Sequence, residues 1–327
     1  MQVIIPLAGK GTRLRPHTHL VPKPLLKVAG RPVMDWVMDR LDGLDVSELI
    51  FITGHLKEAV EAHARHRYRI PSRFIEQRVQ DGTAGAVNLA RPHVREPVLI
   101  VFVDTVFEAD LTLVTRTDAD GIIWAKEVED WQRFGVVVTD AAGYMTRIVE
   151  KPSEPVSKLA NIGLYWIRDT AALWQGIDHA LGAPANKGEF YLTDAFQWMV
   201  EAGRRILAAE VGGWYDCGAP GTLLETNGIL LAKGAARPCA FPGVTIHDPV
   251  LIEDGVTIED SEVGPNVTVE AGTRIRGSRL RDAIVGRDAV LDGVRLERAL
   301  LGNRVALRGL RAADVSLGDD STLSAEG

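Results

Sequence analysis

Two glycines and two basic residues near the start of the chain could hold phosphate groups. Gly9 and Gly11 follow a short apolar stretch, and Arg13 and Lys23 come soon after them. A glycine turn can bring backbone N–H groups against an anion, because glycine has no Cβ to hold the anion away. Arginine suits bidentate contact with phosphate oxygens, and lysine acts as a compact point charge. The spacing matches neither the dinucleotide-binding fingerprint nor the P-loop, so it predicts a phosphate site of another kind.

Two carboxylates stand after apolar or aromatic stretches farther along the chain. Asp104 directly follows the apolar residues 98–103, and Asp216 follows Trp214-Tyr215. Open α/β sheets place ligands at the carboxyl ends of their strands, which favours a binding role for Asp104. Each residue also has a plainer interpretation, since Asp104 could only turn the chain and Asp216 could only pair with a local arginine.

The elements that must position these residues alternate along the first two-thirds of the chain. Strands are expected at residues 3–7, 49–53, 73–76, 98–103, 135–138, 147–149 and 159–167. Helices are expected at residues 33–41, 56–66, 83–90, 170–179, 193–201 and 220–232, with Thr83 as a helix cap. Continuous apolar strands separated by helices predict an α/β fold, a Rossmann-like and mostly parallel sheet flanked by helices.

The texture of the sequence changes after a linker that we expect at residues 234–242. Beyond this linker, single aliphatic residues recur about every six positions, with Gly or Asp at turns. A hexapeptide period is typical of a left-handed parallel β-helix, in which each hexad forms one strand of a triangular coil. The predicted domains are therefore residues 1–233 for the α/β part and residues 243–327 for the β-helix. An irregular β tail is the alternative.

Composition and charge narrow the class of protein. The chain has 327 residues, a formal net charge of -7 and no basic run, so no nucleic-acid partner is expected. Cys217 and Cys239 make no disulfide framework, which favours a reducing compartment. We see no signal peptide in the N-terminal residues and no apolar run of membrane-spanning length. We therefore expect a cytoplasmic protein without a membrane partner.

Several segments in residues 1 to about 232 resemble those of the sugar-1-phosphate nucleotidyltransferases, also called sugar-nucleotide pyrophosphorylases, and occur in the same order. The N-terminal segment Gly9-Lys10-Gly11-Thr12-Arg13, followed by Pro22-Lys23-Pro24-Leu25, is highly specific. The other matching segments are residues 77–84, 103–104, 134–137, 149–152, 160–165, 188–194 and 214–218. The resemblance implies a nucleotidyltransferase fold and an enzyme that joins a nucleoside triphosphate to a sugar 1-phosphate, releasing pyrophosphate.

The resemblance also implies a role for each candidate residue. Asp104 and Asp216 would hold Mg²⁺, the implied cofactor. Arg13 would bind the departing pyrophosphate, Lys23 would neutralise charge at the reacting phosphates, and Lys151 would hold the sugar phosphate, so that these three are the catalytic residues. The nucleotide would be bound by Leu7, Ala8, Gly9, Gly11, Thr12, Arg13, Gln77 and Gly82. The sugar phosphate would be bound by Gly135, Glu150, Lys151 and Asn161.

The base and the sugar are indicated less directly. The glycine loop is one residue shorter than in many thymidylyl- and guanylyltransferases and resembles that of bacterial uridylyltransferases. Pro24-Leu25-Leu26 and the segment from Gln77 to Gly82 fit thymidylyltransferases better. We therefore expect dTTP, with UTP a close second, and glucose 1-phosphate as the sugar. Val103 stands where the family usually has glycine, which adds bulk beside the expected metal site.

Other functions remain as alternatives. The chain could be a mannose-1-phosphate guanylyltransferase, or a sensor of sugar phosphate or triphosphate that kept the fold. A β-helix acyltransferase would want a histidine base in the coils, where the sequence offers only His247. Stacked coils leave surfaces that bury well against a partner, so a homo-oligomer is expected, either a dimer, a trimer or a tetramer. His17 and His19 match no role and are expected to be polar loop residues.

Overall fold

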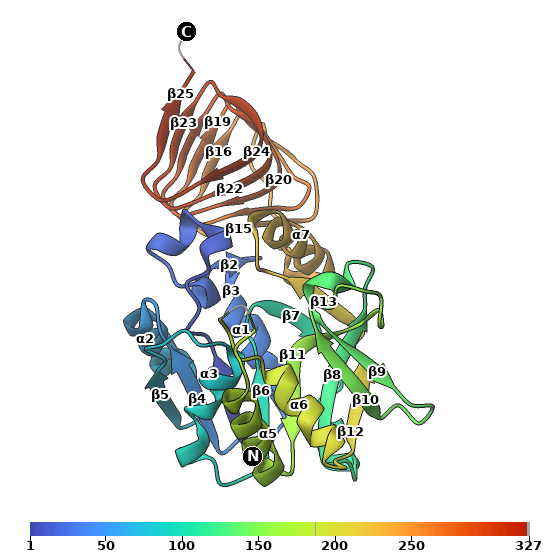
Figure 1. Cartoon of the computed structure of the whole chain (residues 1–327). Coiled ribbons are helices and arrows are strands. Elements are labelled where there is room, and N and C mark those ends of the chain that lie inside the picture. The colour runs from blue at the N-terminus through green and yellow to red at the C-terminus, as the bar shows by residue number, and fades with distance from the viewer. Residues whose placement is uncertain (187, 326–327) are drawn as a thin grey trace. The chain divides into compact units, whose positions relative to one another are not determined.

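The structure is a computed structural model that describes residues 1–186 and 188–325 (Figure 1). Its contacts group the chain into two units. The first unit holds Met1–Lys10 and Val37–Trp214, and the second holds Gly11–Trp36 and the chain from Tyr215 onward. The N-terminal glycine segment is therefore divided between the units. The domain limits at residues 233 and 243 stay a prediction.

The first unit is built on a nine-stranded sheet whose first strands run parallel. These strands are β1 (Gln2–Pro6), β4 (Glu48–Thr53), β5 (Ser72–Glu76) and β6 (Val98–Val101). β1 lies between β4 and β6. β1, β4 and β6 are apolar at consecutive positions because side chains on both of their faces are covered, and Ile4, Ile50 and Ile100 are fully buried.

The sheet changes direction at β11 (Leu159–Ile167), which pairs antiparallel with β6, β8 and β9. The strands of this half are β8 (Gly121–Glu127), β9 (Gly135–Thr139), β10 (Met145–Glu150) and β12 (Ile206–Glu210). β9 and β10 form the predicted hairpin, and β12 joins β8 in parallel. The α/β fold class is confirmed, and the sheet is mixed because β11 and β10 run against the direction of the first strands.

Helices pack on this sheet, and three of them share a core with one of its faces. The helices of the unit are α2 (Lys57–Arg67), α3 (Thr83–Asn88), α4 (Leu113–Arg116), α5 (Thr170–Gly182) and α6 (Leu192–Glu201), and α1 (Val33–Met38) spans the boundary between units. The expected Thr83 cap is wrong, because Thr83 is the first helical residue and its Oγ1 accepts a hydrogen bond from Leu192 N at 2.8 Å. No helix in the described chain is long and apolar enough to cross a membrane.

The second unit begins with a segment of short turns, residues 11–36. This segment contains single helical turns at Thr12–Leu14, His17–His19 and Lys23–Leu25, and then the antiparallel strands β2 (Lys27–Val28) and β3 (Arg31–Pro32). The chain returns to the unit within β13 (Gly213–Asp216) and continues into α7 (Pro220–Leu230) and a π-helical turn, Leu231–Ala235. Pro220 suits the first position of α7, where a backbone N–H would have no helical partner.

The rest of the second unit is a parallel β-helix, which confirms the predicted class of this part (Figure 1). Its strands are β14 (Thr245–Ile246), β15 (Val250–Ile252), β16 (Thr257–Glu259), β17 (Glu262–Val263), β18 (Val267–Val269), β19 (Arg274–Arg276), β20 (Arg279–Val285), β21 (Val290–Asp292), β22 (Arg295–Leu301), β23 (Ala306–Arg308), β24 (Arg311–Leu317) and β25 (Thr322–Ser324). Equivalent strands of successive coils pair in parallel, so aliphatic side chains stack in interior rows. One such buried row is Ile258, Ile275, Leu291 and Leu307.

The later coils repeat every 16 residues, as the pairing of Arg276 with Asp292 shows. Corner residues with left-handed backbone stand at Gly277, Asp282 and Asp288, and the same corners recur at Gly293, Arg298 and Arg304. The three sides of a coil are therefore unequal, and only one has the six residues of a hexad. This explains why the hexapeptide register in the sequence is imperfect.

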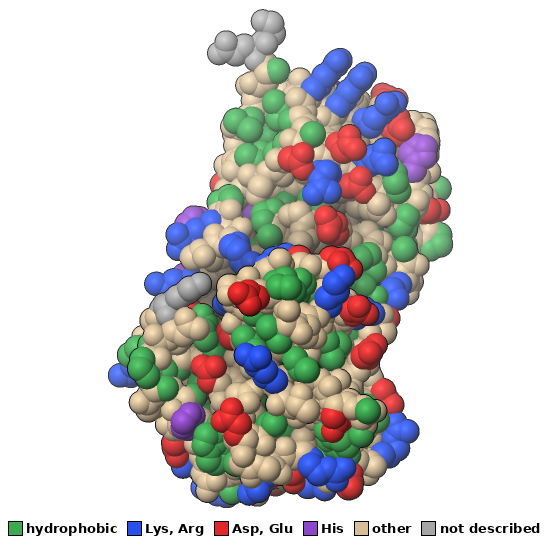
Figure 2. Space-filling model, turned by 45° about the vertical axis from the view of Figure 1, so that its right-hand side comes forward, with side chains coloured by type: hydrophobic (Ala, Val, Ile, Leu, Met, Phe, Trp, Pro, Cys, Tyr) green, Lys and Arg blue, Asp and Glu red, His purple; other side chains and the backbone are tan. Residues whose placement is uncertain are grey.

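Charged side chains on the outside of the coils also form rows. Arg276 and Asp292 lie in register on neighbouring coils, with an N–O distance of 2.9 Å. Arg298 and Asp314 form the same kind of pair at 2.8 Å. Figure 2 shows basic and acidic side chains next to one another on this part of the surface. Opposite charges in adjacent strands stabilise the stack modestly.

Candidate functional site

Three residues that we expected to bind the sugar phosphate lie together at the start of β9, namely Gly135, Glu150 and Asn161. A Cβ on Gly135 would lie 2.4 Å from Asn161 Nδ2 and 2.8 Å from Glu150 Oε2, inside normal contact distance. Thr193 is also adjacent, because its Cγ2 would lie 3.0 Å from the same Cβ. Only glycine fits at position 135 without moving these side chains. We name Gly135, Glu150, Asn161 and Thr193 the cradle.

Glu150 is the ionisable group of the cradle. Its side chain is 14% exposed, and Oε2 accepts a hydrogen bond from Thr193 Oγ1 at 3.2 Å. Burial raises the pKa of Glu150, and the nearby Lys151 partly offsets this effect. Lys151 Nζ lies 3.6 Å from Glu150 Oε1. The carboxylate is therefore held by protein groups and can still accept hydrogen bonds from hydroxyl groups.

Lys151 carries the cation next to the cradle. The residue has a left-handed backbone, with φ of 43°, and its N–H donates to Phe134 O at 3.0 Å. The side chain is 45% exposed, and Nζ lies 4.8 Å from the centroid of the Tyr191 ring. The ring restricts the lysine without neutralising it, so the ammonium group is accessible to an anion.

Asn161 holds the cradle together. Its Nδ2 donates to Gly135 O at 3.0 Å, and its Oδ1 accepts from Gly163 N at 3.3 Å and from the Tyr165 hydroxyl. The pKa of Tyr165 is raised, mainly by burial and then by the charges of Glu150 and Asp104. Asn161 therefore shapes the site, and Tyr165 lies near both carboxylates.

Asp104 stands in the turn between β6 and β7 (Thr105–Glu108). Phe102 N donates to Gly163 O at 2.9 Å, which ties this turn to β11. Val103 is buried, and Asp104 is half-buried beside it. Asp104 thus follows the end of a parallel strand, as expected, and lies close enough to Tyr165 for its charge to help raise the pKa of that residue.

Gln77 and Gly82 form the candidate base-binding part of the first unit. Gln77 is 7% exposed, and its Nε2 donates to Asp81 Oδ1 at 2.9 Å and to Gly82 O at 3.3 Å. Both bonds use the amide nitrogen, which leaves the carbonyl Oε1 as an acceptor. Gly82 has φ of 109°, and a Cβ there would lie 2.4 Å from Phe190 O, so no other residue fits.

The residues after β1 also belong to this unit. Leu7 N donates to Ile52 O at 2.9 Å and so extends the strand. Ala8 is buried against Gly54, where a Cβ would lie 2.6 Å from Ala8 O. A Cβ on Gly9 would meet nothing within 4 Å, so the backbone here is open to a ligand.

The second unit contains the other basic residues of the predicted site. Gly11 has φ of 60°, and a Cβ there would lie 3.0 Å from both Lys23 Cβ and Thr18 Cγ2. Arg13 is exposed, and its guanidinium lies beside Gly218, where a Cβ would be 3.4 Å from Arg13 Nη2 and 2.8 Å from Asp216 Oδ1. Asp216 Oδ1 accepts from Gly218 N at 2.7 Å. The side chains of Arg13 and Asp216 therefore both lie against the backbone at Gly218.

His17 was expected to be a polar loop residue, and this expectation is wrong. The residue is 7% exposed, and its Nε2 lies 3.0 Å from Ser316 Oγ. Burial lowers the pKa of His17 to about 4, although the charge of Asp319 acts in the opposite direction. His19 is exposed, as expected.

The predicted site residues thus fall into two groups, one in each unit. The first unit holds Leu7, Ala8, Gly9, Gln77, Gly82, Asp104, Gly135, Glu150, Lys151 and Asn161, and the second holds Gly11, Thr12, Arg13, Lys23 and Asp216. The two expected metal ligands, Asp104 and Asp216, belong to different units. Reasoning from the sequence missed Thr193 and Tyr165, although both stand in the matching segments 188–194 and 160–165.

Comparison with known proteins identifies the class. Residues 2–233 match the family described as Nucleotidyl transferase, so the chain belongs to this family. A crystal structure of UDP-glucose pyrophosphorylase complexed with UDP-glucose matches with a TM-score of 0.65 and 22% identity, over 71% of this chain and 98% of that chain. This match confirms the fold.

Relatives narrow the class further. AglF of Haloferax volcanii, a UTP–glucose-1-phosphate uridylyltransferase, is 35% identical over 67% of this chain and 92% of AglF. The glucose-1-phosphate thymidylyltransferase of Streptomyces griseus is 28% identical over 85% of this chain and 80% of its own length. The bifunctional protein GlmU of Methanococcus aeolicus is 34% identical over 79% of this chain, which spans only 62% of GlmU. These relatives confirm the resemblance to sugar-1-phosphate nucleotidyltransferases.

Proposed function

We propose that this protein is an enzyme that condenses a nucleoside triphosphate with a hexose 1-phosphate, giving an NDP-sugar and pyrophosphate. The observation that carries the proposal is the cradle, in which a glycine that cannot be replaced brings together Glu150 and Asn161 beside the exposed cation of Lys151. Glu150 would accept hydrogen bonds from sugar hydroxyls while Lys151 binds the phosphate. Family membership supports the same reaction class.

The reaction would need no nucleophile from the protein. A phosphate monoester has a second pKa near ~6, so the sugar phosphate is largely a dianion at neutral pH. One of its oxygens attacks the α-phosphorus of the triphosphate. The bond from that phosphorus to the oxygen that bridges the α- and β-phosphates breaks. Pyrophosphate leaves with the bonding electrons. The protein must hold two polyanions in line and offset their repulsion, which is the proposed role of Arg13, Lys23 and Lys151.

Arg13 is the proposed partner of the departing pyrophosphate. It is exposed, and its guanidinium lies beside Gly218. Its guanidinium can therefore bind two phosphate oxygens at once. Gly11 and Thr12, at the start of the same helical turn, would offer backbone N–H groups to the triphosphate.

Asp104 and Asp216 are the proposed ligands of Mg²⁺. The described residues contain no group of three or more His, Cys, Asp or Glu side chains that could bind a metal alone. Two carboxylates suit Mg²⁺, which takes one or two of them together with phosphate oxygens and water. When bound, the ion would neutralise charge on the phosphates. Asp216 is prepared for such a role because Gly218 N fixes the orientation of its carboxylate.

For the base we propose thymine, with uracil a close second. The free carbonyl Oε1 of Gln77 suits a base that offers a ring N–H, as thymine and uracil do at N3. Guanine also has a ring N–H, so the guanylyltransferase alternative stays. Glucose 1-phosphate is the proposed sugar, as in the names of AglF and the Streptomyces griseus relative.

The test is pyrophosphate release with Mg²⁺, across dTTP, UTP, GTP, CTP and ATP against glucose, mannose, galactose and glucosamine 1-phosphates. A clear preferred pair would support the reaction class and fix both substrates. If the folded protein releases no pyrophosphate with any pair of substrates, the proposal is overturned and a sensor is favoured. A homo-oligomer, as dimer, trimer or tetramer, and a cytoplasmic location are also proposed, and light scattering on the purified chain tests the former.

A further inference from the structure

The segment that carries Arg13 and Lys23 lies against the β-helix. Thr268, Ile284, Leu300 and Ser316 occupy one row on four successive coils. Neighbouring strands are about 4.8 Å apart, so the row covers about 14 Å from its first residue to its last. Residues 16–29 make contacts at both ends of this row.

The far end of the row holds the turn that directly follows Arg13. His17 Nε2 and Ser316 Oγ are 3.0 Å apart, and the imidazole is buried. The next contact is steric, because a Cβ on Gly318 would lie 3.1 Å from both Cβ and Cγ of Pro16. The coil that contains β24 thus contacts two loop residues, because Ser316 bonds to His17 and Gly318 lies close to Pro16.

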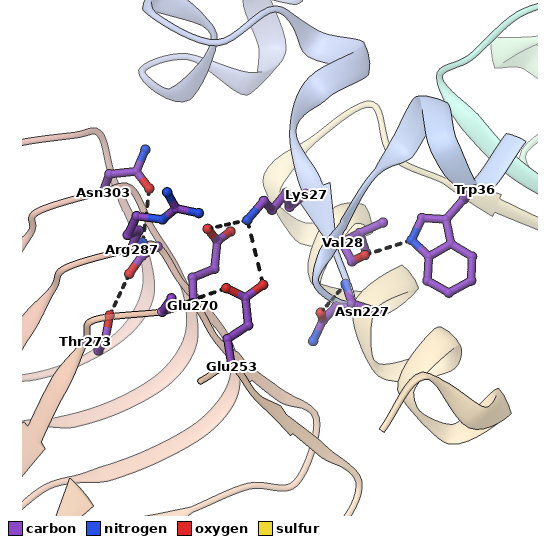
Figure 3. A network of polar contacts seen from close by, with 12 residues as sticks. Lys27, Val28, Trp36, Asn227, Glu253, Glu270, Thr273, Arg287 and Asn303 are labelled. Carbon is purple, nitrogen blue, oxygen red and sulfur yellow. Dashed lines mark hydrogen bonds and ion pairs between the residues drawn. The ribbon is translucent and has the colours of Figure 1, made fainter. Parts of the chain in front are cut away.

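The near end of the row holds the residues that follow Lys23 (Figure 3). Lys27 Nζ lies 2.7 Å from Glu270 Oε2 and 3.8 Å from Glu253 Oε1. Asn227, fully buried in α7, accepts from Ala29 N at 2.9 Å and from Thr268 Oγ1 at 2.7 Å. One buried amide therefore joins the loop to the first residue of the row.

Between these ends a hollow separates part of the loop from the coils. A cavity of about 350 Å³ lies there, with Val21, Leu25 and Leu26 on the loop side and Ile284 and Leu300 on the coil side. The contacts at the two ends tie the loop to the coils on either side of this cavity. Lys23 lies between the two anchored ends, and Arg13 lies in the turn Thr12–Leu14, just before the first.

We infer that the β-helix is a positioning element of the triphosphate site. His17, Ser316, Glu270 and Asn227 act as positioning residues that hold Arg13 and Lys23 where the triphosphate binds. The inference rests on the proposed function for the role of the two cations. It assigns to the coils a part in catalysis that neither an oligomerisation surface nor an acyltransferase role would predict.

The test uses the full chain with Ser316→Ala, Glu270→Gln and the double variant. The double variant should raise KM for the triphosphate about fivefold or more, as expected for two lost, partly buried contacts, while KM for the sugar phosphate stays within about twofold. Ser316→Thr keeps the hydroxyl and should restore wild-type values. Thr322→Ala removes an exposed hydroxyl from the same end of the β-helix and serves as the matched control.

Hydrogen exchange gives a second measurement that does not depend on activity. In the double variant, amides of residues 12–26 should exchange faster, with the coils unchanged. Wild-type kinetics together with wild-type exchange would overturn the inference. Faster exchange with unchanged KM would also overturn it, since the anchors would then not position the site. If the wild-type chain turns over no substrate pair, the proposed function fails, and unchanged exchange would still reject the anchoring.

Gly318→Ala offers a variant that adds a contact rather than removing one. Its new Cβ would press on Pro16 without backbone strain, because residue 318 lacks a left-handed backbone. We expect a raised KM for the triphosphate and an unchanged KM for the sugar phosphate. Equal effects on both substrates would indicate general damage and contradict the inference.

Discussion

Gly135 and Asn161 approach so closely that a β-carbon on residue 135 would stand 2.4 Å from the Asn161 amide nitrogen. Gly135→Ala must therefore displace Asn161 or Glu150. We expect kcat/KM for the sugar phosphate to fall about tenfold or more, because small misplacements at a reacting centre are costly. Gly182→Ala, where a Cβ meets nothing within 4 Å, should leave steady-state kinetics unchanged. An active Gly135→Ala enzyme would refute the role of the cradle.

The raised pKa of Glu150 predicts a pH effect on sugar-phosphate binding. Burial makes the carboxylate take up a proton at a higher pH than an ordinary glutamate. Lowering the pH through this pKa should weaken binding, because a protonated carboxyl loses acceptor capacity. The sugar phosphate also titrates, so KM must be compared with that of Glu150→Gln across the same range. Identical profiles for both proteins would show that Glu150 is not the titrating group.

Arg13→Ala should impair use of the triphosphate selectively. Loss of a charged contact to phosphate predicts a fall of about 10- to 100-fold in kcat/KM for the triphosphate. Binding of the sugar phosphate should change little. Arg15→Ala, an exposed neighbour, is the control. The reverse pattern, with the sugar phosphate affected instead, would exchange the two phosphate subsites.

Asp104→Asn and Asp216→Asn should each reduce turnover about 100-fold or more while the fold survives, as for other losses of charge stabilisation. Circular dichroism checks the fold, and Asp118→Asn, which alters an exposed ion pair with Arg205, is the control. Chelation of divalent metal should stop the wild-type reaction, and added Mg²⁺ should restore it. Wild-type rates in both variants would reject the metal assignment.

His17 predicts a loss of stability in mild acid. Its folded-state pKa of about 4 lies below the ordinary value of 6.5, so the unfolded chain binds more protons between these values. The free energy of unfolding should therefore fall as the pH drops from 6.5 towards 4, by up to about 3 kcal/mol from this residue. Denaturant unfolding at several pH values, compared with His17→Gln, isolates the effect. If the free energy of unfolding depends on pH in the same way in both proteins, His17 is not the cause of the loss.

Much of the fold was predictable because its signals are local. The strands around Ile4, Ile50 and Ile100 are continuous apolar stretches, and their burial on both faces follows directly from that pattern. The direction of β11 was not predictable, because pairing with β6 and β8 depends on partners far along the chain. The 16-residue coil was also hidden, since its unequal sides imitate an imperfect hexad.

The candidate site was also predictable only where its signals are local. The motifs identified Gly135, Glu150 and Asn161, and the structure brings them together. No local signal indicated that His17 is buried, because its partner Ser316 lies 299 residues away. The importance of Thr193 could not be seen either, since a threonine at the start of a helix is common and its bond to Glu150 forms only in the folded chain.

The 16-residue period of the coils has a consequence for how this chain can change in evolution. Gain or loss of one whole period keeps the rows of the later coils in register, whereas a slip of one residue within a strand would turn interior side chains outward. Between Glu270 and Ser316, however, the number of coils is matched to the span of residues 17–27, which bond both ends. Duplication of a coil is therefore tolerated beyond Ser316, and within that stretch it would separate the loop from one of its anchors.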